Sequence, residues 1–278
     1  LCSQINGNSP LMLAIILNKL EIAEILIECP RTNLNMTNYE NRSVLALASS
    51  CNFPLFHVLY YKLREILDAD QLNYAFYLSD DAIAQVFLDS SKLNVNYRRA
   101  IIPDSTTKAF AYESALIHSI KNDQYVKTLL ILAHPQFDPI QSNVNDAIFL
   151  SIEKGIFDIF DALLKYVDVN AISRKSETLV EYCCRYKFSK AVDRIINDDK
   201  FDIEKSKFKN LVLSMLHGPA DEDNIYDIEL LKKLIEFDEN HLHEFHFDQL
   251  LPSGKSFFTH IIVSCDLDKT MNYLSEDK

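Results

Sequence analysis

Three residues near the C-terminal end, Gly254, Lys255 and Ser256, match the last residues of a phosphate-binding P-loop. A complete P-loop has a further glycine, separated from its Gly-Lys pair by four residues, so that main-chain amides can wrap the phosphates. Gln249 occupies that position here. The motif is therefore incomplete, and the sequence does not predict a nucleotide site at this place.

A second cluster, His241, His243 and His246, has a spacing at which imidazoles could share a zinc or copper ion. Cysteine is absent nearby, and Glu244 is the only carboxylate among the three histidines. This composition favours a solvated or partner-facing loop over a metal site.

The six cysteines form no C-x-x-C pair, and the adjacent Cys183 and Cys184 cannot readily bridge each other. We expect reduced thiols that pack in a core. His118 and His260 share one position of the repeat described below, so a catalytic pairing of cysteine with histidine would need distant units to converge. No hydrolase, metalloprotease or paired-carboxylate motif is present. The sequence predicts no catalytic residue, cofactor or metal.

Bulk composition excludes several classes of protein. The chain has 278 residues, 48% of them hydrophobic, and only 4 glycines, which favours one or two helical domains. Its net charge of −12 argues against nucleic acid and against anionic membranes as partners. No apolar run is long enough for a transmembrane helix, and the start has neither an initiator Met nor a signal peptide. We expect a cytoplasmic protein and a processed or truncated piece of a longer chain.

A short pattern recurs along the whole chain: a hydroxyl or polar residue, any residue, an apolar residue, two more and a small residue. Five of the seven spacings between its copies lie within two residues of 33, which is typical of a repeat protein. The copies begin at Ser9, Ser43, Tyr74, Ser114, Asp146, Thr178, Lys209 and Ser256.

An amphipathic run follows each copy by about a dozen residues, with apolar residues at helical spacing. We expect these runs to be the second helices of helix–turn–helix units. They cover residues 21–28, 55–67, 82–89, 125–133, 156–167, 189–196, 225–237 and 268–274. Short segments rich in Asn and Asp close most units and are typical of extended turns.

This unit resembles the ankyrin repeat. The T-P-L-H-x-A motif of that family is best matched by SPLMLA at residues 9–14, and its finger motif by VDVN at residues 167–170. The turn between the two helices carries Gly155, or Asn at Asn18 and Asn52. The motif His is missing throughout, and with it the local hydrogen bond between repeats that the resemblance implies. The chain is similar to divergent ankyrin arrays of protist proteins.

The resemblance implies an all-α helical repeat solenoid of about eight degenerate repeats that forms a single domain over residues 1–278. The units begin near residues 6, 40, 71, 111, 143, 175, 206 and 253. Insertions lie at about 96–110 and 217–252, and we expect a kink or a soft joint at each. Stability in such an array is a sum of unit and interface terms.

In the ankyrin family, finger tips and first helices line a concave surface that binds other proteins. Basic clusters recur at finger positions of this otherwise acidic chain, and Arg and Tyr are favoured at binding hot spots. The expected partner-binding residues are Tyr39, Tyr97, Arg98, Arg99, Arg174, Lys175, Lys205 and Lys207.

The expected function is that of a non-catalytic scaffold for protein–protein interaction. The alternative is a structural component of a cytoskeletal or ciliary, microtubule-associated assembly, which the aromatic-rich composition would suit. An unrecognised enzyme or metal-binding protein is a remote third possibility. Ordinary solvated charge is the competing interpretation of each basic cluster.

Overall fold

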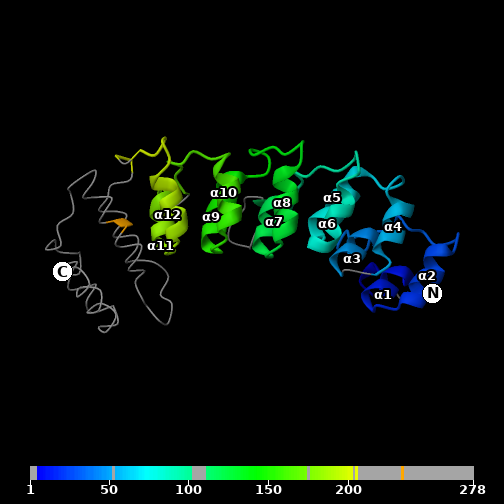
Figure 1. Ribbon diagram of the computed structural model, residues 1–278. Coiled ribbons are helices and arrows are strands. Elements are labelled where there is room, and N and C mark those ends of the chain that lie inside the picture. The colour runs from blue at the N-terminus through cyan, green and yellow to red at the C-terminus, as the bar shows by residue number, and fades with distance from the viewer. Residues whose placement is uncertain are drawn as a thin grey trace, which may run out of the picture. The chain divides into compact units, whose positions relative to one another are not determined.

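The computed structural model consists mainly of short helices joined by tight turns (Figure 1). The residues that it describes are 5–51, 54–101, 111–173, 176–202, 204–205 and 233–234. The chain divides into two compact units, unit 1 (Leu1–Ala147) and unit 2 (Ile148–Lys278), with the boundary inside the helix α9 (Val144–Glu153). Within each unit the helices follow one another in pairs in chain order.

The first helix of a pair usually begins at a side-chain cap. The hydroxyl of Ser9 accepts a hydrogen bond from the main-chain N–H of Met12 at the start of α1 (Pro10–Ile16). Such a cap gives an unpaired N–H of the helix end its partner, and so it fixes where the helix begins. Ser43, Ser114 and Thr178 cap α3 (Val44–Ser50), α7 (Ala115–Lys121) and α11 (Leu179–Arg185) in the same way.

Two first helices begin earlier than the hydroxyl pattern indicates. The cap of α5 (Ala69–Leu78) is Asp68, whose carboxylate accepts a hydrogen bond from the N–H of Gln71. Tyr74, which the pattern puts at the cap, lies buried inside this helix. A carboxylate caps a helix as well as a hydroxyl does, so a pattern built on hydroxyls misses this start. Helix α9 likewise begins ahead of Asp146.

The second helices lie where the amphipathic runs predict them. Two of these helices, α8 (Tyr125–Ala133) and α12 (Ser189–Ile196), match the predicted ranges residue for residue. The others are α2 (Leu20–Glu28), α4 (Phe56–Leu63), α6 (Asp81–Phe87) and α10 (Phe157–Leu164). The last two predicted runs lie outside the described residues, apart from 233–234.

Four of the turns between paired helices contain one residue with positive φ. Gly155 (φ 67°) and Asn18 (φ 51°) confirm the turn residues predicted from the sequence. Asp123 (φ 56°) and Lys187 (φ 55°) hold the same conformation at the matching turns. The left-handed region is costly for a residue with a Cβ, so Lys187 in particular stores backbone strain.

First helices stack on first helices, and second helices on second helices. In unit 1, α3 contacts both α1 and α5, and α6 contacts α8; in unit 2, α10 contacts α12. The buried rings of Phe56 and Phe87 lie 5.5 Å apart between the second helices of unit 1. Within each unit the hydrophobic core therefore lies between neighbouring helix pairs, as expected for stacked repeats.

Side chains also tie each repeat to the main chain of its neighbour. Ser49 Oγ donates to the carbonyl of Ala75 (2.9 Å), Lys127 Nζ to that of Tyr77 (2.9 Å) and, within unit 2, Asn170 Nδ2 to that of Lys200 (2.8 Å). Two of these bonds end on carbonyls among the last four residues of α5, which the helix itself leaves unpaired, and the third ends on the turn after α12. They join the repeats of a chain that lacks the motif His.

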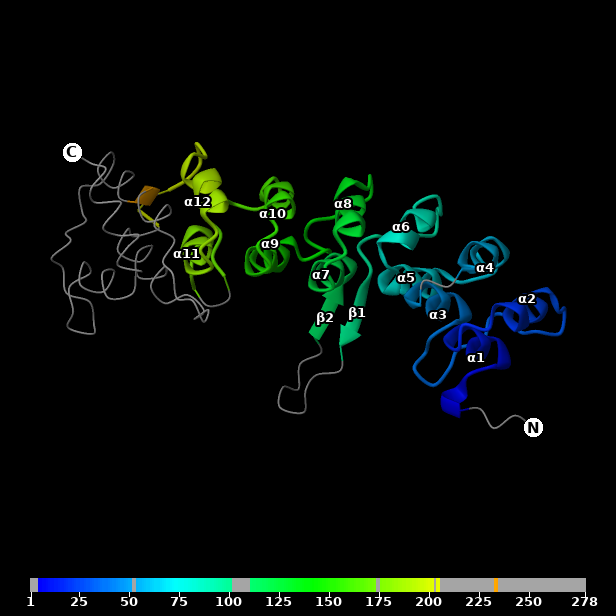
Figure 2. The same ribbon diagram turned by 60° about the horizontal axis from the view of Figure 1, so that its bottom comes forward.

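The segment before a first helix folds back on itself, and we call each such closed loop a finger. Single β-bridges close two fingers, between Thr37 and Ser43 and between Ile172 and Thr178. A third finger is longer: its strands β1 (Arg98–Ile101) and β2 (Ala111–Ser114) pair antiparallel. The pair projects from the N-terminal end of α7 (Figure 2). Each finger closes on the residue that caps the next first helix.

Strand β1 lies within the predicted insertion at 96–110, and β2 begins directly after it. The sequence predicts a kink or soft joint there and no strand, so this small sheet is missed. The extra residues extend the finger and leave the flanking helix pairs in place. Across the described ranges, every helix is too short or too polar to span a membrane.

Candidate functional site

The two strands of the long finger present two chemically different faces. In register, Arg99 lies opposite Glu113, and Arg98 lies opposite Ser114. Side chains alternate between the faces of a strand, so Arg99 and Glu113 share one face. Arg98 shares the other face with Tyr112, its diagonal neighbour. We call these the inner face and the outer face.

The inner face packs against helices α5 and α7 through Glu113, which is 9% exposed. Its carboxylate accepts hydrogen bonds from the hydroxyl of Tyr77 (2.5 Å) and from Nζ of Lys121 (2.5 Å), and Nδ1 of His118 lies 3.2 Å away. Burial acts to raise the pKa of the Glu113 carboxyl, but these hydrogen bonds outweigh it and leave the pKa below its ordinary value. The carboxylate of Glu113 is therefore ionised and already hydrogen-bonded to three side chains, and it anchors the finger to α5 and α7.

His118 and Tyr77 stack beside this carboxylate, with ring centroids 4.0 Å apart. Burial lowers the pKa of His118, and the contact with Glu113 only partly offsets the change, so the imidazole is neutral at pH 7. Burial, together with the hydrogen bond to Glu113, raises the pKa of the Tyr77 hydroxyl far above its ordinary value. These groups do not suit proton transfer near neutral pH, and the cluster stabilises the finger.

Arg99 covers the inner face from the side of α5. Its guanidinium lies over the ring of Tyr74, 4.8 Å from the centroid, in a cation–π contact. Tyr97, at the start of the finger, is half-buried, and its ring meets that of Tyr77 edge-on at 6.1 Å. Arg99 and Tyr97 are therefore partly buried by contacts within unit 1.

The outer face points to solvent and carries Arg98 and Tyr112. Tyr112 is 54% exposed, and the Arg98 guanidinium lies 5.6 Å from its ring centroid. Within the described residues, neither Arg98 nor Arg99 forms an ion pair or a side-chain hydrogen bond. The outer face thus offers a charged and an aromatic side chain that are oriented by each other and by the sheet.

Lys127 lies beneath this region and is fully buried. Its Nζ donates to the carbonyls of Tyr77 (2.9 Å) and Ser79 (2.7 Å), at the C-terminal end of α5. Burial lowers the pKa of Lys127 to about 7, and the carboxylates of Asp81 and Asp80 only partly counter it. The sequence gives no sign of this burial, because Lys127 belongs to an ordinary amphipathic run.

Comparison with known proteins agrees with this arrangement. Residues 6–39 match the sequence model of the ankyrin repeat family. The chain is similar in structure to the ankyrin repeat domain of Bcl-3, described as a unique member of the IkappaB protein family, with a TM-score of 0.52. That likeness covers 82% of this chain and 99% of the Bcl-3 domain at 14% identity. The chain therefore contains an ankyrin repeat at residues 6–39 and has the fold of an ankyrin repeat array.

A second solved structure is also similar to the chain, with a lower score. The human ASB11 ankyrin repeat domain matches with a TM-score of 0.44 and 14% identity, covering 90% of each chain. Among curated proteins, no sequence matches. The expected all-α ankyrin fold is confirmed, and ankyrin repeats are modules of protein–protein interaction.

The other predicted partner-binding residues lie apart from the long finger of the ankyrin array. Tyr39 is at the tip of the first finger and is 80% exposed. Its ring lies over Gly7 so closely that a Cβ there would come within 2.7 Å. Lys205 is exposed, 3.4 Å from the carboxylate of Asp202. Arg174, Lys175 and Lys207 lie outside the described residues, as do the His241–His246 cluster and Gly254–Ser256.

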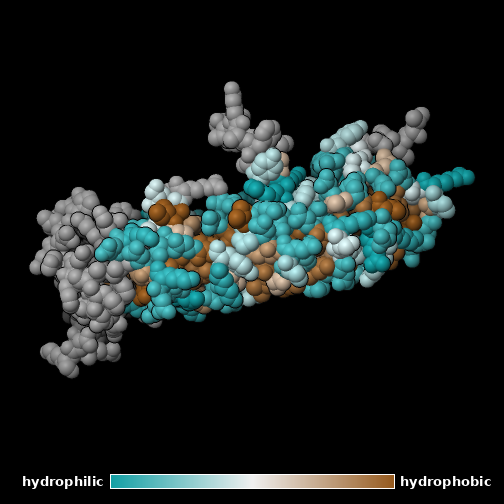
Figure 3. Space-filling view, turned by 90° about the horizontal axis from the view of Figure 1, so that it is seen from above, coloured by the Kyte–Doolittle hydropathy of each residue, from teal (hydrophilic) through white to brown (hydrophobic). Residues whose placement is uncertain are grey.

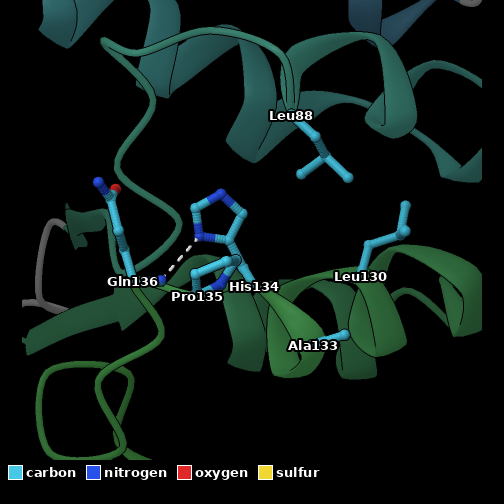
Figure 4. A pocket seen from close by; sticks show the side chains of 6 residues that line it. All are labelled: Leu88, Leu130, Ala133, His134, Pro135 and Gln136. Atoms are coloured by element: carbon cyan, nitrogen blue, oxygen red, sulfur yellow. Dashed lines mark hydrogen bonds between the residues drawn. The ribbon is translucent and has the colours of Figure 1, made fainter.

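Other candidate sites on the ankyrin array carry less chemistry. A shallow pocket of about 390 Å³ lies between Leu88 after α6 and the end of α8 (Figure 4). Its polar groups are few, and Nδ1 of His134 already accepts a hydrogen bond from the N–H of Gln136 (3.2 Å).

Cys183 and Cys184 are fully buried, and burial raises the pKa of both thiols, so they are unreactive packing residues as expected. Over the described ranges, no group of potential ligands could hold a metal ion.

An apolar surface lies at the N-terminal end of unit 1 (right in Figure 3). Two of its residues, Ile22 and Ile25, are spaced to share one face of α2, and they are 54% and 70% exposed. The exposed set also includes Ile16 and Leu17 at the end of α1 and Leu20, the first residue of α2. We call these five residues the end patch. An exposed group of this size marks a contact surface or an aggregation risk.

Proposed function

We propose that the chain is a non-catalytic scaffold that binds other proteins through the fingers of unit 1. The observation that carries this proposal is the pair Arg98 and Tyr112. It combines the two residue types favoured at binding hot spots, exposed together on a finger that a buried network fixes in place. Such pre-organisation lowers the entropy that binding would otherwise cost.

Tyr39 on the first finger extends the proposed contact surface. The finger is held in place because the N–H of Tyr39 donates to the carbonyl of Asn6 (3.1 Å) and Nδ2 of Asn38 donates to Oδ1 of Asn8 (2.9 Å). The predicted residues Arg174 and Lys175 occupy the sequence between the bridge residues of the unit 2 finger, and we propose the same role for them. Lys205 and Lys207 are proposed contacts of the following repeat.

Site-specific photo-cross-linking tests this proposal. Benzoylphenylalanine would replace Tyr39 or Tyr112 on the fingers, or Tyr61 on α4 as a control, since all three are exposed tyrosines of unit 1. In native extract we expect one protein to be captured from both finger positions but not from position 61. Arg98→Glu should abolish its capture from position 112. Equal capture from position 61, or capture that survives Arg98→Glu, would overturn the proposal.

A structural component of a cytoskeletal or ciliary assembly is the second candidate. The end patch favours it, because a built-in component can bury such a surface against its neighbours. Benzoylphenylalanine at Ile25 would then capture a filament protein such as tubulin, even when high salt and detergent are present during irradiation. Capture confined to the fingers, and lost when salt is present during irradiation, would favour a soluble adaptor in the cytoplasm.

A further inference from the structure

The long finger is an island of positive charge on an acidic chain. From Asn94 to Lys121 the sequence has two more basic than acidic residues, whereas the net charge of the whole chain is −12. Within the island, Glu113 is already neutralised by Lys121. The sequence of residues 102–110 contributes one Asp and one Lys and leaves this balance unchanged. The local potential therefore attracts anions that the rest of the chain repels.

The charge available to a ligand is that of Arg98. Its guanidinium rests on the ring of Tyr112, and in the described part of the chain its N–H groups have no carboxylate partner. A guanidinium that stacks on an aromatic ring keeps its edge free to donate two parallel hydrogen bonds to a carboxylate. Arg99 lies on the opposite face but adds its positive charge to the same field.

A buried hydroxyl beside Arg99 points the same way. Tyr74 is 8% exposed, and its hydroxyl has no hydrogen-bond partner among the described residues. The guanidinium of Arg99, which lies over this ring, likewise has no ion pair or side-chain hydrogen bond to the described residues. The positive charge of Arg99 at this buried corner is thus uncompensated by the described residues, and it adds to the field that attracts an anionic ligand to the finger.

We propose that the long finger binds a short acidic segment of a partner protein, in which an Asp or Glu carboxylate pairs with Arg98 in the positive field that Arg99 strengthens. This inference rests on the proposed function and names the chemistry of its partner. The segment is short because a longer polyanion would meet the negative charge of the surrounding repeats. Its apolar side chains pack on Tyr112 of the outer face.

A selection from a random-peptide phage display library tests the acidic segment directly. The wild-type chain and the Arg98→Glu variant would be used as parallel baits. The matched control bait is Lys165→Glu with Lys190→Glu, which introduces acidic charge at exposed lysines of unit 2. We expect peptides that bind the wild type and the control but not Arg98→Glu, and we expect these peptides to be enriched in Asp and Glu.

Replacing the key Glu of a selected peptide by Gln keeps its shape and removes its charge. The affinity for the wild type, measured by fluorescence anisotropy, should fall about tenfold, as for the loss of one charge-assisted hydrogen-bond pair. Peptides that depend on Arg98 but carry no excess of Asp or Glu, or a Gln peptide that binds equally well, would overturn this inference.

The two proposals fail in different ways. If the partner captured by the cross-linker depends on Arg98 but no acidic peptide is selected, the scaffold proposal stands and the acidic segment is wrong. If neither the partner nor any peptide depends on Arg98, the long finger is not a binding surface and both proposals fail.

Discussion

Arg98 and Arg99 are adjacent in sequence but lie on opposite faces of the two-stranded sheet, over the rings of Tyr112 and Tyr74 respectively. One arginine faces solvent and the other is half-buried against α5. The same substitution at the two positions should therefore have different effects. Substitutions of Arg98 thus test binding, and substitutions of Arg99 test packing, within the same finger.

Arg99→Glu should lower the free energy of unfolding by about 1 kcal/mol or more, because it removes a cation–π contact and brings a second carboxylate opposite Glu113. Arg98→Glu should leave stability within about 0.5 kcal/mol of the wild type, as for other surface changes. Urea denaturation followed by circular dichroism measures both. Equal destabilisation by the two variants would contradict the assignment of Arg98 to a free face.

Glu113→Gln should lower the free energy of unfolding by about 1–3 kcal/mol, because Lys121 and Tyr77 lose a charged acceptor in a buried place. The control is Glu28→Gln, which removes an ion pair with Lys62 that both side chains make in solvent. Exposed pairs contribute about 0–1 kcal/mol, so this control should change little. If both variants unfold at the same urea concentration, Glu113 does not anchor the finger.

Because Lys127 is buried, the free energy of unfolding should depend on pH above neutrality. Its pKa is about 7 in the folded chain and lies near 10.5 when it is unfolded, so between these values the unfolded chain binds more protons. Stability contributed at this site therefore rises with pH, by about 2 kcal/mol from pH 7 to pH 9. Urea titrations of the wild type and of Lys127→Met at both pH values measure this difference. A gain of the same size in Lys127→Met would assign it to another group.

The turns between paired helices offer a test of backbone strain. Gly155→Ala should destabilise by about 1 kcal/mol, because φ is 67° and no atom lies within 4 Å of the new Cβ to give a compensating contact. Lys187→Gly, at the matching turn of the next repeat, should relieve strain of similar size, less the added entropy of the unfolded chain. Thermal melting of the two variants should shift in opposite directions. A lower melting temperature for Lys187→Gly would contradict this account.

Ile22→Lys with Ile25→Lys should reduce the binding of the apolar dye ANS without loss of helix content, because both side chains of the end patch are largely exposed. Sedimentation velocity should show less self-association at high protein concentration. The control, Ala23→Lys, places the same charge at a fully buried position of the same helix and should unfold this repeat. A loss of helix content in the double variant would mean that the end patch belongs to the core.

Most of the helix pairs could be predicted from the sequence because their signals are local. A hydroxyl cap such as Ser9 and an apolar stripe such as that of α8 depend only on residues within one helical turn or two. The start of α5 is missed because Asp68, a carboxylate, takes the place of the hydroxyl. Apart from the early start of α9 and the strands β1 and β2, the predicted alternation of helices and turns holds in the described residues.

The candidate site is less predictable because its geometry depends on residues far apart in sequence. The sequence marks Tyr97, Arg98 and Arg99 as one basic cluster, but the pairing of β1 with β2 decides which face each side chain takes. The sequence contains no pattern that groups Glu113, His118 and Lys127 in one buried environment. They come together only because α5, α7 and α8 stack, and that depends on contacts between repeats.

The bonds between neighbouring repeats have a consequence for how such a chain can evolve. Ser49, Lys127 and Asn170 each hold the next or the preceding repeat by a main-chain carbonyl, a group that every amino acid carries. A mutation of the acceptor residue therefore leaves the acceptor atom in place. Each repeat can accumulate substitutions without a matched change in its neighbour, so the array can lose its family motif while the register of its stacking is inherited.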